Sequence, residues 1–307
     1  MKRLTRLGLL FTAALAAGCA ASAPPGRGAL TDEIDRAIGR PKNVTVAVAF
    51  ADLGSGVVLL REETQRFHAA STMKLPILLA VYDAIDKGDL RADQPIAVRN
   101  RFASLMDGSP YSLDPKDDED PELYAAVGGT RPLGELARRM IVRSSNLAAN
   151  LLLEKVGTSR VMDLLRLLGA DDTQVLRGVE DEKAFRAAMN NTTTAKDLLA
   201  MLRALESSAR GNRPPGGPSP ASAQAMLEIL AAQQLNEKIP AGLPPGTRVA
   251  HKTGDITGIH HDAAIVYPPG RPPYVLVVLT GGFFDQKAAD RTIAAVSRAV
   301  WQHVTAQ

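Results

Sequence analysis

The chain has 307 residues, of which 45% are hydrophobic and 22% charged, a composition typical of a globular protein with one or two cores. A wholly disordered chain is therefore excluded. Three of the 36 Lys and Arg residues stand in the first six positions, so the remainder carries 33 basic and 33 acidic residues. This nearly neutral chain has no basic run interleaved with aromatic residues, which excludes a nucleic-acid partner on electrostatic grounds.

The N-terminal segment has the pattern of an export signal. Lys2, Arg3 and Arg6 precede an apolar run over residues 7–17, which is too short to span a bilayer as a mature helix. Small residues follow this run. We therefore predict that residues 1–18 are a signal peptide and that the protein is exported to the periplasm or cell envelope.

The only cysteine, Cys19, directly follows Ala16, Ala17 and Gly18. This segment resembles the lipobox of bacterial lipoproteins, although Leu15 stands one place too early. The resemblance implies a lipid anchor on Cys19, with residues 19–30 as a flexible tether rich in Ala, Ser, Pro and Gly. The alternative is an ordinary cleaved signal with an unmodified cysteine. A single cysteine has no partner for an internal disulfide.

Order is predicted to begin near Thr31, as the cap of a first helix with Ile34 and Ile38 on its apolar face. Two strands joined by Gly54 and Ser55 follow, in the pattern of a β-hairpin. Three further strands and a last helix from about Asp285 end the chain. The predicted strands cover residues 44–53, 57–62, 248–252, 262–267 and 274–280.

The region between the two groups of strands, residues 71–235, has mainly helical periodicity, for example over 75–85, 133–142 and 147–156. Strands from both ends of the chain must then pair across this insertion. The predicted fold is α/β (α+β), with a five-stranded antiparallel sheet flanked by N- and C-terminal helices. An α/β lobe of residues 31–70 and 236–307 would carry residues 71–235 as an inserted all-α lobe, with the ligand in the crevice between them.

Three short motifs occur in chain order on elements suited to catalysis. Ser71 and Lys74 stand three residues apart at the start of a predicted helix, so their hydroxyl and amine share one face. Ser144-Ser145-Asn146 begins a later helix, and Lys252-Thr253-Gly254 lies on the first late strand. Each motif alone has an ordinary structural explanation. Together, over residues 31–304, they resemble the class A β-lactamase and penicillin-binding serine hydrolase family.

A serine hydroxyl needs a neighbouring base before it can attack a carbonyl carbon. Lys74 is the nearest candidate, and burial together with the like charge of Lys252 would lower its pKa far enough for this role. Ser71 would then be the nucleophile, and Ser144 would relay a proton to the leaving nitrogen.

The resemblance also implies how the substrate is held. The backbone amides of Ser71 and Asp255 would form the oxyanion hole. The side chains of Lys252, Thr253 and Ser144, beside Gly254, would bind the carboxylate of a β-lactam or of a peptidoglycan-like acyl-D-Ala peptide. Asn146 would hold the substrate's side-chain amide. This chemistry requires no metal and no cofactor.

Residues 177–194 resemble the omega loop of the family, with Glu180 in the place of the carboxylate that activates the hydrolytic water. The alternative for Glu180 is a surface ion pair in a structural loop. Asp181 and Glu182 are weaker candidates for the base.

The predicted omega loop departs from the family pattern at three positions. Glu180 follows Arg177 by three residues where two are usual, Ala184 replaces an asparagine, and Asn191 replaces the aspartate that normally pairs with the arginine. Outside the loop, Ser145 replaces an aspartate of the second motif. The three departures within the loop predict a differently shaped loop.

A zinc site is the alternative for the histidines at His251, His260 and His261, which stand near Asp262. Their spacing matches no known zinc motif, and the family resemblance makes Asp262 structural. His251 is then expected to line the site.

Three functions remain open on the sequence. The first is a serine β-lactamase, the second a D,D-peptidase or other serine hydrolase of the same fold, and the third a non-hydrolysing penicillin-binding receptor. We expect a monomer that contacts a membrane only through the lipid anchor.

Overall fold

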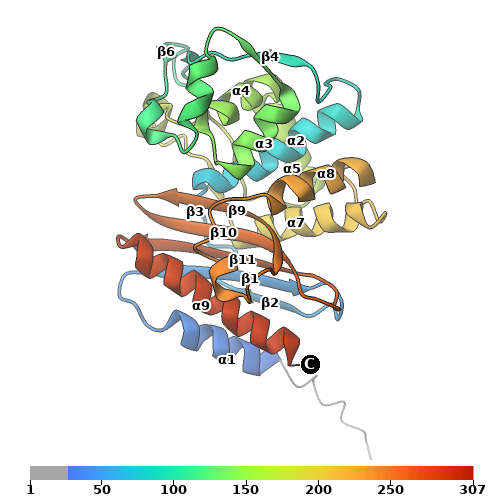
Figure 1. The fold of residues 1–307 in the computed structure, drawn as a ribbon. Helices are drawn as coiled ribbons and strands as arrows, with labels where there is room; N and C mark the ends of the chain where they lie inside the picture. The colour runs from blue at the N-terminus through green and yellow to red at the C-terminus, as the bar shows by residue number, and fades with distance from the viewer. Residues whose placement is uncertain (1–26, 307) are drawn as a thin grey trace, which may run out of the picture.

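The computed structural model describes residues 27–306. The predicted signal peptide, Cys19 and most of the predicted tether lie outside the described residues. A five-stranded sheet in the order β2-β1-β11-β10-β9, with every neighbouring pair antiparallel, divides the molecule (Figure 1). Its strands are β1 (Thr45–Asp52), β2 (Val58–Arg61), β9 (Arg248–Ile256), β10 (Gly258–Tyr267) and β11 (Tyr274–Phe283).

The two ends of the chain meet in the middle of this sheet. Strand β1 pairs with β11, with Val48 opposite Val278, so the predicted pairing across the insertion is confirmed. The hairpin β1–β2 also forms as predicted, with the Asp52 carboxylate accepting hydrogen bonds from the backbone N–H groups of Gly54 and Ser55 in its turn. The late strands are longer than predicted, because ladder pairing continues into Ile256 and Phe283.

Helices α1 (Arg27–Ile38) and α9 (Gln286–Thr305) cover one face of the sheet (Figure 1). The prediction that Thr31 caps the first helix is wrong, since the helix begins four residues earlier. Leu30 and Ile34, one turn apart, are fully buried in the core beneath the sheet, so residues assigned to the tether belong to the folded body. Asp285 caps α9 by accepting a hydrogen bond from the Lys287 amide.

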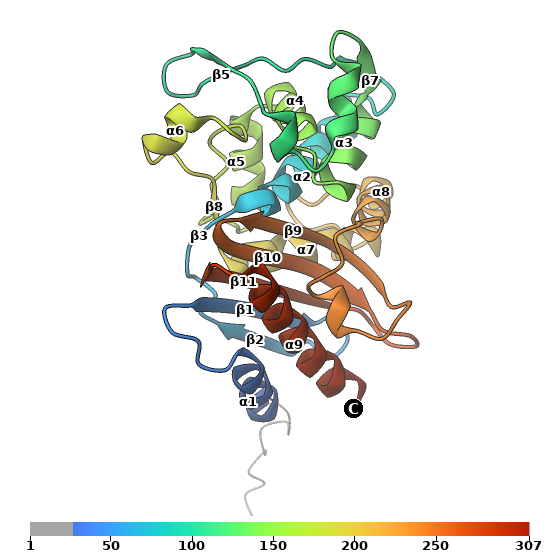
Figure 2. The ribbon, with the colours of Figure 1, turned by 60° about the vertical axis from the view of Figure 1, so that its left-hand side comes forward.

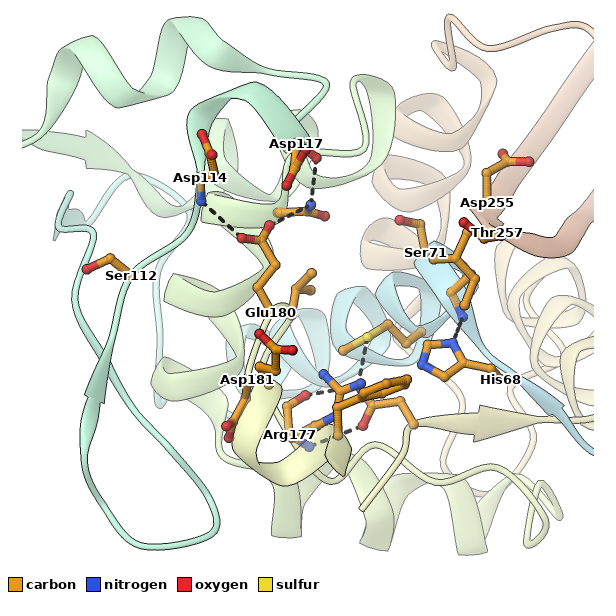
Figure 3. A pocket seen from close by; sticks show the side chains of 18 residues that line it. His68, Ser71, Ser112, Asp114, Asp117, Arg177, Glu180, Asp181, Asp255 and Thr257 are labelled. Atoms are coloured by element: carbon orange, nitrogen blue, oxygen red, sulfur yellow. Dashed lines mark hydrogen bonds between the residues drawn. The ribbon is translucent and has the colours of Figure 1, made fainter. Parts of the chain in front are cut away.

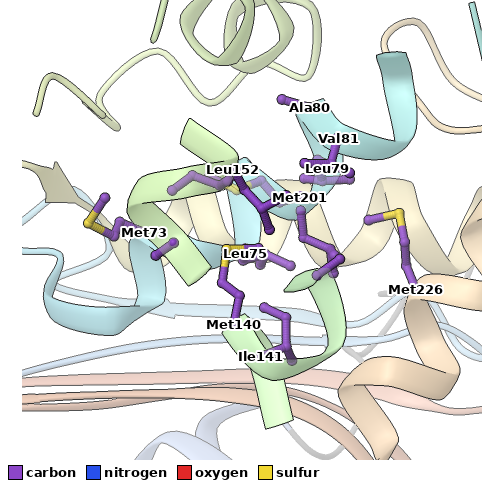
Figure 4. Packing of buried hydrophobic residues seen from close by; sticks show 14 of the residues in the cluster. Met73, Leu75, Leu79, Ala80, Val81, Met140, Ile141, Leu152, Met201 and Met226 are labelled. Atoms are coloured by element: carbon purple, nitrogen blue, oxygen red, sulfur yellow. The ribbon is translucent and has the colours of Figure 1, made fainter. Parts of the chain in front are cut away.

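The opposite face of the sheet carries the remaining helices. Helix α2 runs through their centre and buries side chains on all sides, as expected of a helix with apolar residues around its whole circumference. Figure 4 shows its Leu75 and Leu79 packed among Met140, Leu152 and Met201. The surrounding helices are α3 (Leu133–Val142), α4 (Asn146–Val156), α5 (Thr158–Leu167), α7 (Ala195–Ala209) and α8 (Pro220–Ala231), with α2 at Lys74–Asp86.

Short elements shape the loops of this region. Strand β3 (Phe67–His68) pairs with β8 (Thr192–Thr193) where the helices meet the sheet (Figure 2). The remaining elements are β4 (Pro95–Ala97), β5 (Phe102–Ala103), β6 (Pro110–Tyr111), β7 (Thr130–Pro132), α6 (Glu182–Arg186) and the 3-10 turns η1 (Ala70–Met73), η2 (Pro115–Asp117), η3 (Pro121–Ala126) and η4 (Pro240–Gly242). The division into two lobes stays a prediction. Among the helices described, none has the length and apolar character needed to cross a bilayer.

We expect Leu30→Ala to lower the free energy of unfolding by about 2–4 kcal/mol, because it removes a fully buried side chain and leaves a cavity. Urea denaturation of the protein lacking residues 1–19 measures this change. The neighbouring exposed Ala29→Ser should change it by less than about 0.5 kcal/mol. Equal stability of both variants would mean that this turn of α1 contributes nothing to the core.

Candidate active site

Ser71 lies in the turn η1, directly before α2. The preceding Ala70 has the uncommon left-handed φ of 46°, and its amide donates a hydrogen bond of 3.0 Å to His68 Nδ1. The Thr72 side chain closes the turn by donating to the Ala69 carbonyl at 2.5 Å. These contacts present the partly exposed Ser71 hydroxyl at the end of a buried helix, in a fixed position.

The Lys74 amine is fully buried against the same hydroxyl. Its Nζ lies 2.9 Å from Ser71 Oγ, 2.5 Å from the Ser144 carbonyl oxygen and 2.8 Å from Asn146 Oδ1. Burial lowers the pKa of Lys74 well below its ordinary value, and the charge of Lys252 lowers it further. A neutral amine can accept the serine proton, so this geometry is suited to a general base.

Ser144 occupies a left-handed conformation, with φ of 57°, just before α4. Its hydroxyl lies 3.2 Å from Lys74 Nζ and 3.0 Å from Lys252 Nζ, so it joins the two buried amines. Ser145, which replaces the family's aspartate, caps α4 by accepting a hydrogen bond from the Ala148 amide. The turn therefore retains a helix cap.

Asp118, in the loop between η2 and η3, holds the N-terminus of α4, a contact that the sequence analysis missed. Its Oδ2 accepts hydrogen bonds of 2.9 Å from the backbone amides of both Asn146 and Leu147. A carboxylate at a helix N-terminus is favoured by the helix dipole and by the free amides there. The acidic composition of residues 107–121 was the only signal in the sequence, and it does not distinguish Asp118 from its neighbours.

Lys252 and Gly254 lie on β9, the outer strand beside Ser71. Burial is the largest cause that lowers the pKa of Lys252, to about 7, and the charge of Lys238 contributes in the same direction. A Cβ on Gly254 would lie 3.0 Å from the Thr72 backbone nitrogen and 3.2 Å from the Ala69 carbonyl oxygen. Glycine at this position lets β9 approach the Ser71 turn closely.

Asn146 connects Lys74 to Glu180. Its Oδ1 accepts from the lysine, while its Nδ2 lies 3.4 Å from Glu180 Oε1. Glu180 Oε2 accepts a 3.0 Å hydrogen bond from the Asp114 amide (Figure 3). Burial, and then the charges of Asp117 and Asp118, raise the pKa of Glu180, which makes this carboxylate a stronger base.

Asn150 of α4 determines where Glu180 points, and sequence reasoning did not find this residue. Its side chain accepts from the Val179 amide at 2.6 Å and donates to the Val179 carbonyl at 3.0 Å. The next residue, Glu180, then turns with a left-handed φ of 61°. The extra residue between Arg177 and Glu180 is accommodated in this turn.

The base of the predicted omega loop is held by hydrogen bonds between the Asn191 side chain and the backbone. Its Oδ1 accepts from the amides of Leu176 and Arg177 at 2.8 and 3.1 Å, and its Nδ2 donates to the Arg177 carbonyl at 2.9 Å. The Arg177 guanidinium donates to the carbonyls of Met189 and Gly178. The asparagine therefore replaces a side-chain ion pair with contacts to the main chain.

Asp181 is occupied in holding the loop. Its carboxylate accepts hydrogen bonds of 2.7 Å from Ser104 Oγ and the Leu105 amide, and it caps α6 through the Ala184 amide. Ala184 itself is buried. Glu182 pairs with Arg186 instead.

Ser71, Asn146, Glu180 and Asp255 line one cavity of about 720 Å³, large enough for a drug-sized ligand. Figure 3 shows Glu180 and Ser71 on different elements around this space. His68 also lines it, and burial lowers the pKa of His68 to about 4, so its ring is neutral near pH 7.

The other histidines have structural partners. His251 is buried between Asp262 Oδ1 at 3.0 Å and Asn236 Oδ1 at 3.2 Å. The expectation that His251 lines the site is wrong, because its ring is held between these two partners and does not line the cavity that contains Ser71. Among residues 27–306, no three His, Cys, Asp or Glu side chains are grouped as metal ligands.

A serine hydroxyl 2.9 Å from a buried lysine amine, beside a five-stranded antiparallel sheet, is the arrangement of a class A β-lactamase-like serine hydrolase. The model of the β-lactamase enzyme family matches residues 29–304, and the chain belongs to this family. A β-lactamase from Streptomyces fradiae is 27% identical over 302 residues, which cover 95% of this chain and 91% of that protein.

Solved structures show the same similarity. A β-lactamase from Xanthomonas campestris pv. campestris is 30% identical with a TM-score of 0.74, covering 90% of this chain and 97% of that one. The structure of PBP-A is 28% identical with a TM-score of 0.75, and the match covers 91% of this chain and 96% of that one. A PBP-A mutant in an acyl-enzyme complex with penicillin G is 27% identical with a TM-score of 0.76, and the match covers 93% of this chain and 100% of that one.

We expect Asn191→Ala to loosen the omega loop, because it leaves two backbone amides and a carbonyl without their partner. The free energy of unfolding should fall by roughly 1–3 kcal/mol. Hydrogen–deuterium exchange should accelerate over residues 177–190. Asn190→Ala, which removes only a 3.4 Å contact with Arg177, is the control. Unchanged exchange in the Asn191 variant would show that other contacts hold the loop.

Proposed function

We propose that this chain is a serine β-lactamase that opens β-lactams through an acyl-enzyme on Ser71. The observation that carries the proposal is the 2.9 Å contact between Lys74 Nζ and Ser71 Oγ, beside a cavity that Glu180 also lines. The family supports the same activity.

In the acylation step, Ser71 Oγ attacks the β-lactam carbonyl carbon while its proton passes to Lys74. The backbone amides of Ser71 and Asp255 stabilise the oxyanion of the tetrahedral intermediate. As the ring C–N bond breaks, the nitrogen takes a proton from Ser144, whose hydroxyl lies within 3.2 Å of Lys74 Nζ. The proton first taken by Lys74 can return along this contact.

Binding of the substrate carboxylate is assigned to Lys252, Thr253 and Ser144. The lysine is the charged group of this set, and its 3.0 Å contact with Ser144 Oγ brings the two donors together. The side-chain amide of the substrate is assigned to Asn146, which lines the cavity.

Deacylation is assigned to Glu180, which would take a proton from water as the water attacks the ester carbon. Its raised pKa and half-buried position beside Asn146 support this role. Asp181 is engaged by Ser104 and Leu105, which makes it unsuitable.

The sequence also supports an exported protein anchored in the cell envelope through Cys19, with a monomeric catalytic body. Mass spectrometry of the membrane fraction tests the anchor. Cys19→Ala should release the protein into the soluble fraction without a lipid adduct, whereas an unmodified wild-type cysteine would contradict the proposal.

Glu180→Gln should acylate normally but hydrolyse the acyl-enzyme at least about 100-fold more slowly, because the amide cannot take a proton from water. Intact mass spectrometry after mixing with benzylpenicillin should show a persistent adduct in this variant and a transient one in the wild type. Glu182→Gln, on the same loop, is the control.

Unchanged turnover in the Glu180 variant would reject Glu180 as the base. A persistent adduct in the wild type itself would favour a penicillin-binding or D,D-peptidase role. Ser71→Ala should form no adduct.

The pH dependence of kcat/KM should report the ionisation of the Lys252 amine. Because its pKa is about 7 and kcat/KM reports the ionisation of the free enzyme, kcat/KM for benzylpenicillin should fall as the pH rises above about 7. Above that pH the neutral amine no longer attracts the carboxylate. Arginine stays protonated, so Lys252→Arg should lose this alkaline limb even if its maximal activity is lower. If kcat/KM fell identically at alkaline pH in both enzymes, the ionising group would be one other than Lys252.

A further inference from the structure

Four ionisable side chains gather behind the end of β9, and three of them belong to residues with no part in the proposed reaction. Lys238 Nζ lies 3.0 Å from Asp255 Oδ2 and 3.2 Å from Asp290 Oδ1. His260 Nδ1 lies 2.8 Å from Asp255 Oδ1. We call Lys238, Asp255, His260 and Asp290 the β9 clamp. They come from the segment before η4 and from β9, β10 and α9 respectively.

The clamp is buried on one side and open to the cavity on the other. The side chains of Lys238 and His260 are 3% and 6% exposed, whereas that of Asp255 is 30% exposed. Asp255 also lines the cavity that contains Ser71 (Figure 3). The clamp therefore connects a buried ionic cluster to the edge of the active site through one carboxylate.

Both oxygens of Asp255 are held by separate donors. The second ring nitrogen of His260, Nε2, lies 3.2 Å from the Phe283 carbonyl oxygen. Both His260 nitrogens thus face oxygen atoms, which fixes the orientation of the ring. Lys238 binds the other oxygen, and the neighbouring carboxylates of Asp255 and Asp290 raise the pKa of Lys238 against the opposing effect of burial.

The backbone around Asp255 needs such support. Asp255 is the second-last residue of β9, and the pairing of the adjacent strand β10 with β11 shifts register between Gly258 and Ile259. Asp255 pairs with His260 across the ladder, one residue before the last pair of β9 and β10, so the side-chain contact reinforces the end of the strand. Buried ion pairs contribute little net stability, because desolvation opposes their attraction. A role in positioning the Asp255 backbone accounts better for these ion pairs beside the cavity.

We propose that Lys238 and His260 are positioning residues that hold the backbone amide of Asp255 in the oxyanion hole, acting through the Asp255 carboxylate. This inference rests on the proposed acylation of Ser71. Loss of one oxyanion donor costs about 100- to 1,000-fold in kcat, so a donor that is displaced but still present should cost roughly 10-fold.

The test compares Lys238→Met with the wild type. Acylation by benzylpenicillin in single-turnover stopped flow should slow roughly 10-fold, with little change in the apparent substrate dissociation constant. Phenylboronic acid forms a tetrahedral adduct with an active serine and places an oxygen in the oxyanion hole, so its affinity should fall by a similar factor.

Two variants at His260 repeat the test independently. His260→Asn places an amide donor near the position of Nδ1 and should retain most of the acylation rate, whereas His260→Phe should lose it as Lys238→Met does. This pair decides the proposal if Lys238→Met does not fold. Tyr267→Phe is the control for stability, because Tyr267 lies at the far end of β10 and the substitution removes a partly buried 2.7 Å hydrogen bond to Glu206 of α7.

Wild-type acylation rates and boronate affinity in Lys238→Met and His260→Phe would overturn the proposal. So would an equal loss in Tyr267→Phe, since destabilisation alone would then explain the effect. Absence of acylation in the wild-type enzyme would instead contradict the proposed function, so the two failures are distinguishable.

Discussion

The burial of the Lys74 amine beside Ser71 is the constraint on which the site depends. An ammonium group without water is costly unless it is paired, and within residues 27–306 no carboxylate hydrogen-bonds to it. Its contacts are a hydroxyl, a carbonyl and an amide oxygen, from Ser71, Ser144 and Asn146. The position of Lys74 at the start of the buried helix α2 imposes this environment, because most side chains of the helix are enclosed in the apolar core. A packing requirement thus produces a lysine able to act as a base.

The start of α4 connects the two halves of the proposed reaction. Asn146 contacts both Lys74, assigned to acylation, and Glu180, assigned to deacylation. Asp118 holds the first amides of the helix, and Asn150 one turn later holds the main chain before Glu180. One short helix therefore sets the relative positions of Lys74 and Glu180, the two proposed bases.

The opposite wall is the outer strand β9. Gly254 allows it to approach the Ser71 turn, and the β9 clamp fastens the residue that follows. The two walls belong to parts of the chain more than 100 residues apart, and Lys252 joins them through Ser144. The cavity is the space that remains between α4, the omega loop and this strand.

Local patterns in the sequence determined the hairpin, the late strands, the main helices and the spacing of Ser71 and Lys74. These depend on residues within one turn or one strand, where alternation and helical periodicity are sufficient. The three motifs in chain order also identified the family.

Only the tertiary structure decided which distant groups meet. It placed the start of α1 at Arg27, since Leu30 packs against the sheet, and it turned His251 away from the site. It also selected Asp118 from an acidic loop and brought Lys238 and Asp290 to Asp255. Such contacts join residues far apart in the chain, and they depend on how whole elements pack rather than on any local spacing.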